Sequence, residues 1–91
     1  MESSIVIESS DELTAASGRR LLRAMDAASG AAAASVVISL RRVKRIRWNA
    51  LCEFVQHIQR RRDAGFDVRV IDAPPRIERL LEVATLHTSA G

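Results

Sequence analysis

The sequence predicts a small α/β protein, with helices packed on a small, mainly parallel or mixed β-sheet in the order β-α-β-α-β-α. Three β-branched runs alternate with three stretches whose apolar residues recur at helical spacing. A length of 91 residues leaves room for one domain, residues 1–91. A single cysteine excludes an internal disulfide, and an aromatic content of 3% predicts an aliphatic core.

The first strand is expected at residues 5–8, a β-branched run closed by turn residues. A helix follows over residues 14–28, with Thr14 as its N-cap and Ser29-Gly30 at its end. Its apolar residues recur three and four positions apart, at Leu21, Leu22, Met25 and Ala28. The four alanines at 31–34 either form a loop or extend the helix.

The second strand is expected at residues 36–40, where a nearly continuous apolar run indicates burial on both faces. After a basic segment at residues 41–47, the longest helix spans residues 49–64, with Asn49 as N-cap and Gly65 as its stop. The face of this helix expected to be buried carries Leu51, Cys52, Val55, Ile58 and Gln59.

The third strand is expected at residues 68–72, and a last helix opens at Pro75. The buried stripe of this helix is Ile77, Leu80, Leu81 and Ala84, and residues 87–91 are expected to fray. Because three strands make a small sheet, we expect one or two further strands near the termini, or a partner or second copy at a sheet edge.

Positive charge is concentrated in the middle of the chain. The net charge is +3, but residues 39–62 carry eight cations and one anion. The basic segment 41–47 is compatible with an acidic protein partner, with phosphate from a nucleotide or nucleic acid, or with a solvated loop. Three arginines end the long helix, where cations oppose the negative end of the helix dipole.

The spacing of these elements resembles the STAS domain, the fold of anti-sigma-factor antagonists. In that family an apolar strand leads through Asp-Leu and a loop to apolar-Asp-Ser-Ser-Gly-Leu, a long helix, Gly, a strand, a turn with prolines and a helix ending Leu-Leu. The resemblance runs without a gap from Val36 to Leu86, and residues 11–14 stand where the family has Gly-Glu-Leu-Asp. The family's usual first strand is expected to be missing.

The departures from the family pattern fall in the loop before the long helix. Ser39 stands at the strand-end aspartate, and Arg47 replaces the second aspartate. Trp48 replaces the serine that a partner kinase phosphorylates in the family, Asn49 replaces the next serine, and Ala50 replaces the glycine. Tryptophan has no hydroxyl group, so the resemblance implies a surface that phosphorylation at this position cannot regulate.

The resemblance implies a non-enzymatic partner-binding module in bacterial partner-switching signalling. The expected partner-binding residues are Arg45, Arg47, Trp48, Asn49 and Ala50. Their partner would be a kinase-type anti-sigma factor, another STAS protein or, alternatively, the ATPase subunit of an ABC-type lipid transporter. Instead of anchoring a partner, Trp48 could cover the core or an arginine stem. An alternative of another class is a phosphate or nucleic-acid binder that uses the basic segment.

Catalysis finds little support in the sequence. A nucleophile–base pair would need Cys52 with His57 or His87, and Cys52 falls on the helix face expected to be buried. One cysteine and two histidines do not make a structural zinc site, and no glycine-rich phosphate loop is present. We therefore expect no enzyme activity, no cofactor and no metal. Without a targeting segment or membrane span, a cytoplasmic location is expected.

Overall fold

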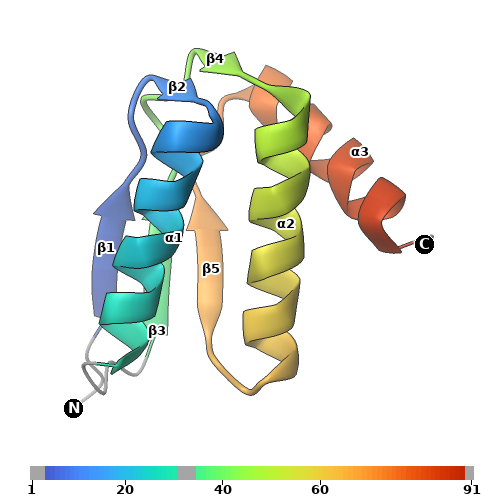
Figure 1. Cartoon of the computed structure of the whole chain (residues 1–91). Coiled ribbons are helices and arrows are strands. Elements are labelled where there is room, and N and C mark those ends of the chain that lie inside the picture. Colours follow the sequence, from blue (N-terminus) through green and yellow to red (C-terminus); the bar gives the residue numbers. More distant parts are fainter. Residues whose placement is uncertain (1–3, 31–34, 90–91) are drawn as a thin grey trace.

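The computed structural model describes residues 4–30 and 35–89, and it confirms the predicted α/β class (Figure 1). Its elements in chain order are β1 (Ser4–Glu8), β2 (Glu12–Leu13), α1 (Ala15–Gly30), β3 (Ser35–Ser39), β4 (Arg45–Ile46), α2 (Trp48–Asp63), β5 (Val68–Ile71) and α3 (Pro75–Ser89). Strands β1, β3 and β5 form a parallel sheet in that order, while β2 and β4 pair as a second, two-stranded parallel sheet. The stretch 31–34 lies outside the described residues.

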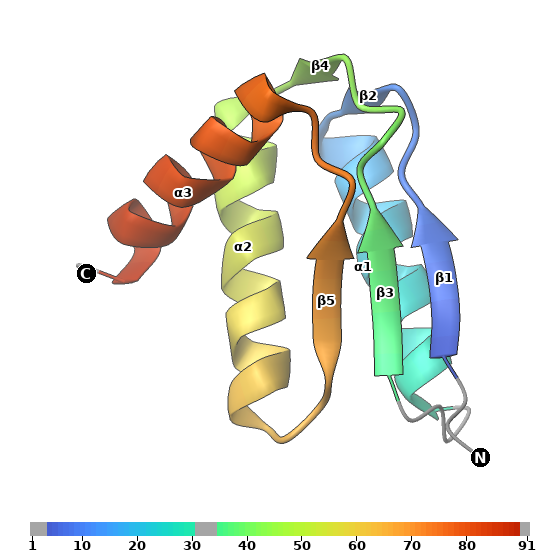
Figure 2. The ribbon, with the colours of Figure 1, turned by 180° about the vertical axis from the view of Figure 1, so that it is seen from behind.

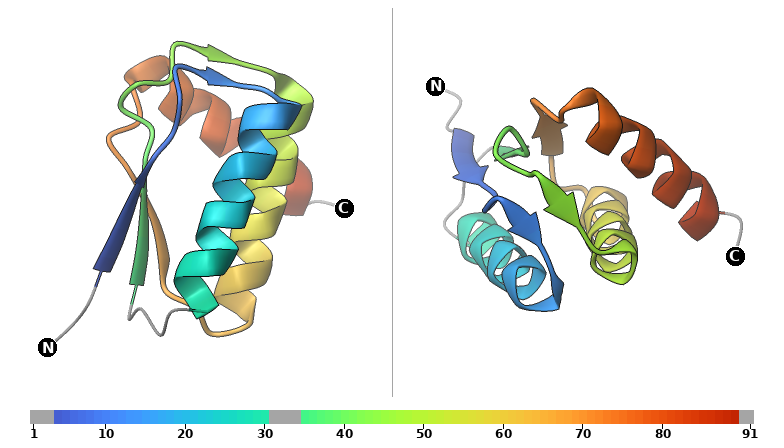
Figure 3. Two further views of the ribbon diagram at one scale, coloured as in Figure 1. Left: turned by 60° about the vertical axis from the view of Figure 1, so that its left-hand side comes forward. Right: turned by 90° about the horizontal axis from the view of Figure 1, so that it is seen from above.

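Helices α1 and α2 cover one face of the three-stranded sheet, and α3 packs against α2 beyond β5 (Figures 2 and 3). Within the described residues, no helix lies over the other face. Val36 and Ile38 point into the core and are buried, whereas Val37 points to the open face and is half-buried. The expectation that this strand is buried on both faces is therefore wrong, because the helices lie on only one side.

The core lies between the sheet and the helices. Its fully buried large side chains are Phe54, Leu13, Met25, Ile38, Leu40, Leu51 and Val68. Phe54, 1% exposed, corrects the expectation of a purely aliphatic core. Cys52 and Gln59, expected on the buried face of α2, are only half-buried because they lie toward the edge of that face. In α3, Ile77 and Ala84 are buried, and the other two residues of the predicted stripe are half-buried.

Local hydrogen bonds set the start of α1. The backbone N–H of Thr14 donates to Ser17 Oγ at 2.8 Å, and the N–H of Ser17 donates to Thr14 Oγ1 at 3.3 Å. The Ser17 hydroxyl also donates to the carbonyl of Glu12 at 2.6 Å. This reciprocal cap confirms Thr14 as the predicted N-cap.

The start of α2 differs from the prediction. The helix begins at Trp48, so Arg47 rather than Asn49 is its N-cap, and the Arg47 side chain makes no capping hydrogen bond. Pairing of β2 with β4 fixes the chain direction before Trp48, which allows the helix to begin without a side-chain cap.

The predicted stop of α2 at Gly65 is confirmed. Gly65 has φ 94°, and the N–H groups of Gly65 and Phe66 donate to the carbonyls of Arg62 and Arg61, each at 3.0 Å. These two bonds form a Schellman motif, whose left-handed residue favours glycine.

The last helix opens at Pro75, as predicted, and continues to Ser89. The expected fraying is therefore wrong for residues 87–89, which are helical, and the side chains of His87 and Thr88 contact α2. Residues 90–91 lie outside the described residues. Two additional strands are present in the described chain. β2 lies close to the N-terminus and β4 lies mid-chain, and they pair with each other and do not extend the three-stranded sheet.

Candidate protein-interaction surface

Backbone hydrogen bonds hold the segment that precedes α2. The N–H groups of Lys44 and Arg45 donate to the carbonyl of Asp11, at 2.7 and 3.1 Å. The N–H of Arg47 donates to the carbonyl of Leu13 at 2.9 Å. These bonds tie the segment to β2, beyond the carboxyl ends of the parallel strands (Figure 1). The surface at this corner is therefore built on a hydrogen-bonded backbone.

Four of the five predicted partner-binding residues are exposed at this corner. We call them the docking corner: Arg45, Arg47, Trp48 and Asn49. Ala50 is only 6% exposed and belongs to the hydrophobic core. The prediction of Ala50 as a contact residue is therefore wrong, because the first turn of α2 directs this side chain inward.

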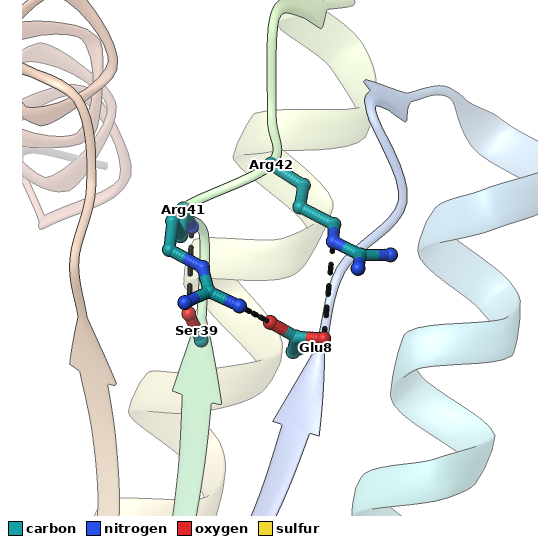
Figure 4. A network of polar contacts seen from close by, with 4 residues as sticks. All are labelled: Glu8, Ser39, Arg41 and Arg42. Atoms are coloured by element: carbon teal, nitrogen blue, oxygen red, sulfur yellow. Dashed lines mark hydrogen bonds and ion pairs between the residues drawn. The ribbon is translucent and has the colours of Figure 1, made fainter.

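The basic segment divides into paired and unpaired cations. Arg41 Nη2 lies 2.5 Å from Oε1 of Glu8 at the end of β1, and Arg42 Nε lies 3.9 Å from Oε2 of the same carboxylate (Figure 4). Within the described part of the chain, Arg45 and Arg47 form no ion pair. The cations of the docking corner thus remain available to an external anion.

Trp48 contributes to the packing of α3 and to the surface. Its ring meets the ring of His87 edge-on, with centroids 5.9 Å apart and an interplanar angle of 62°. Trp48 remains 40% exposed. The side chain therefore contacts α3 at its junction with α2, a contact that neither the core-covering nor the arginine-stem interpretation named, and still offers a wide apolar surface to solvent.

Two exposed apolar residues of α3 were missed by the sequence analysis. Val83 is 53% exposed and Leu86 is 72% exposed. Val83 lies one helical turn before His87, on the side of α3 that carries the contact to Trp48. The spacing of Val83, Leu86 and His87 places them on one face of the last helix, which the sequence alone could have shown. The sequence does not show that α3 folds back onto the start of α2.

The other end of α2 is occupied by contacts within the chain. Arg61 pairs with Asp26 of α1, and His57 Nε2 lies 3.3 Å from Oδ1 of the same carboxylate. Arg62 Nε donates to the carbonyl of Val68 at 2.9 Å. Burial, together with the neighbouring Arg60 guanidinium, lowers the pKa of His57 below its ordinary value. These arginines bind α2 to its neighbouring elements.

The candidate nucleophile and base face different surroundings. Cys52 packs against the hydrophobic core cluster, while His57 contacts Asp26 of α1. Across residues 4–30 and 35–89, no three histidine, cysteine or carboxylate side chains gather as a group fit to hold a metal. None of the described helices has the length and apolar character needed to cross a membrane.

No family model, curated protein or solved structure significantly matches this chain.

Proposed function

We propose that this protein is a non-enzymatic protein-interaction module that binds an acidic partner protein through the docking corner. One observation carries the proposal: Arg45, Arg47, Trp48 and Asn49 are exposed together where hydrogen-bonded β4 leads into α2. The two cations in this group have no ion pair in the described part of the chain.

The chemistry of these side chains suits protein recognition. Tryptophan and arginine are enriched among residues that dominate binding energy, because they combine a large contact area with directed hydrogen bonding. The positive end of the α2 dipole adds to the arginine charges at this corner, which favours carboxylates on the partner. Since backbone bonds to β2 already order this segment, less conformational entropy is lost when a partner binds.

The resemblance to STAS domains supports the same surface. In that family the position of Trp48 carries the serine that a partner kinase phosphorylates, which adds roughly −1.5 to −2 charges to the surface. A tryptophan at this position cannot be phosphorylated, so the charge of the surface at residue 48 does not change. We propose that the partner is a kinase-type anti-sigma factor or another STAS protein, bound without regulation at residue 48. If co-purification recovers a transporter ATPase subunit instead, the same surface would serve a transporter complex.

The test begins with co-purification on the full chain, followed by a binding measurement with the purified partner. Trp48→Ala and Arg47→Glu should each weaken binding at least about tenfold, as expected for residues that dominate an interface. Arg23→Glu is the matched charge control, because Arg23 is exposed on α1 and outside the docking corner. Phe66→Ala is the matched aromatic control, because Phe66 is 41% exposed at the far end of α2. Unchanged affinity in both test variants would contradict the proposed surface.

The same variants also distinguish a nucleic-acid partner from a protein partner. Binding to DNA or RNA would fall steeply with salt, because it depends on the release of counterions from phosphates. We expect no such binding even at about 50 mM salt, since stacking platforms for single strands generally need several aromatic side chains. Salt-dependent nucleic-acid binding that Arg47→Glu abolishes would overturn the protein-interaction proposal.

A further inference from the structure

Strand β1 is an edge of the described sheet, and its outward backbone groups are unpaired there. The N–H of Ser9 donates to the carbonyl of Ser39 at 3.0 Å, so the odd-numbered residues of β1 turn their backbone groups toward β3. Because this direction alternates along a strand, the N–H and C=O groups of Ser4, Val6 and Glu8 point away from the sheet.

The opposite edge of the sheet is partly closed. In β5, the carbonyls of Asp67 and Ile71 accept bonds from β3, so the even-numbered residues point outward. The outward carbonyl of Val68 already accepts the 2.9 Å hydrogen bond from Arg62 Nε. Edge strands with free donors and acceptors tend to pair with another strand, and here β1 is the edge without such a cover.

The sequence of β1 is complementary to itself. It reads Ser-Ile-Val-Ile-Glu, with its apolar residues arranged symmetrically about Val6. When two such strands run antiparallel about Val6, the outward groups of Val6 meet those of Val6 in the second copy. Ser4 then meets Glu8 of the second copy, and Ile5 lies beside Ile7 on the same face of the sheet. Every outward donor of one β1 strand thus faces an acceptor of the other.

We infer that two copies of this chain associate through antiparallel pairing of their β1 edges, centred on Val6. The two three-stranded sheets then form one continuous six-stranded sheet. This edge lies outside the docking corner, so the inference goes beyond the proposed function and does not depend on it.

The side chains around the edge are consistent with such a contact. Val6 is 62% exposed, and Ile5 and Ile7 are only half-buried although they face the helices. Pairing would bury all three further in both copies. Helix α1 packs against β1 and β3 on one face of the sheet, and in the view from above in Figure 3 it lies over that face and not beside the β1 edge.

The area available sets the expected strength of the dimer. A five-residue strand pair alone falls short of the roughly 1,200 Å² that small stable interfaces bury. The two-fold pairing places both α1 helices on the same face of the joined sheet, so any further buried area would have to come from contact between them. Ala24 and Arg20 line the hollow between α1 and β1, and Ala27 follows on the same side of the helix, so the two α1 helices would meet through alanines flanked by a long cationic side chain. We therefore expect a reversible dimer with micromolar affinity.

The test is the molar mass of the full chain, measured by light scattering and sedimentation across micromolar concentrations. The wild-type chain should be dimeric at the upper end of the range. Val6→Pro should be monomeric, because proline removes the outward N–H while the bonds from β1 to β3 stay intact. Val6→Thr is the matched control, since threonine keeps the N–H and the β-branched shape, and it should remain dimeric.

A cross-link gives a readout that does not depend on the stability of the proline variant. Residues facing each other in a hydrogen-bonded antiparallel pair have Cα atoms about 5.5 Å apart, within the range of a disulfide. In a Cys52→Ser background, Val6→Cys should form a disulfide-linked dimer under mild oxidation. Val83→Cys, at a site 53% exposed on α3, should not do so at the same concentration.

Three results would overturn the inference: a wild-type chain that is monomeric throughout the range, a folded Val6→Pro variant that still dimerises, or cross-linking of Val6→Cys no greater than that of Val83→Cys. Retained dimerisation in the docking-corner variants Trp48→Ala and Arg47→Glu would separate this contact from partner binding.

Discussion

At the scale of single residues, the two phenylalanines have opposite roles. Phe54 is 1% exposed in the core, while Phe66 is 41% exposed with the Arg61 guanidinium 5.4 Å from its ring centroid. We expect Phe54→Ala to lower the free energy of unfolding by about 3–5 kcal/mol, because it removes buried contacts and leaves a cavity. Phe66→Ala should cost about 1 kcal/mol or less. Urea denaturation of both variants checks the difference, and equal losses would contradict this assignment of the core.

His57 predicts a pH dependence of stability. Because burial and Arg60 lower its pKa in the folded chain, the unfolded chain, whose histidine titrates near about 6.5, binds the proton more readily. The stability contributed by neutral His57 is therefore complete above that pH and is lost as the pH falls. Between pH 7.5 and 5.5, roughly the window around the unfolded pKa, wild-type Tm should fall more than that of His57→Gln. Parallel pH profiles for the two proteins would contradict this.

Local signals predicted three helix ends correctly and one wrongly, since Arg47 and not Asn49 is the N-cap of α2. Thr14, Gly65 and Pro75 act at the ends of their own helices, and each was assigned from its immediate neighbours. Phe54 was missed because composition says nothing of which aromatic residue enters the core. The contact of Trp48 with His87 joins residues far apart in the chain, so it depends on how α3 folds back.

At the scale of elements, α2 begins without a side-chain cap. Arg47 has φ −92° and ψ 132°, the extended conformation of an N-cap, but its side chain accepts no hydrogen bond. Arg47→Asp should therefore raise the free energy of unfolding by about 0.5–2 kcal/mol, through a new cap and a favourable charge at the helix start. The same variant should bind the partner more weakly. Arg47→Ala, which adds no cap, is the control in chemical denaturation, and equal stability of the two variants would contradict the capping argument.

Two glycines should respond in opposite directions to alanine. An added Cβ at Gly18 or Gly65 meets no atom within 4 Å, so neither change creates a clash. Gly18 lies within α1, where alanine should stabilise by about 0.5–1 kcal/mol. Gly65 has φ 94°, where alanine should destabilise by about 1 kcal/mol or more. Thermal unfolding of both variants tests the pair, and a shift of the same sign in both would contradict it.

The three main strands were predictable from their β-branched apolar runs, and the three helices from the helical spacing of their apolar residues. Strands β2 and β4 were not, because each is two residues long and has no period to detect. Their backbone bonds join residues 11–13 to residues 44–47, and they determine where α2 begins. The docking corner was therefore located from the resemblance, whereas its backbone support became visible only in the structure.

At the scale of the whole molecule, the helices cover only one side of the sheet. Ile38 is fully buried beneath the helices, while its neighbour Val37 faces the open side. Ile38→Thr should lower the free energy of unfolding by about 2–4 kcal/mol, because it removes apolar contacts and buries a hydroxyl. Val37→Thr should cost less than about 1 kcal/mol. Denaturation curves for the pair test the one-sided arrangement, and similar losses would indicate that both faces are buried.

The position of the single tryptophan has a practical consequence. The chain has one Trp and no Tyr, so nearly all of its near-ultraviolet fluorescence comes from Trp48. That indole lies at the docking corner and touches the imidazole of α3, so its emission senses both a bound partner and the attachment of the last helix. The fluorescence of Trp48 would therefore report the binding of a partner to this surface without an added label.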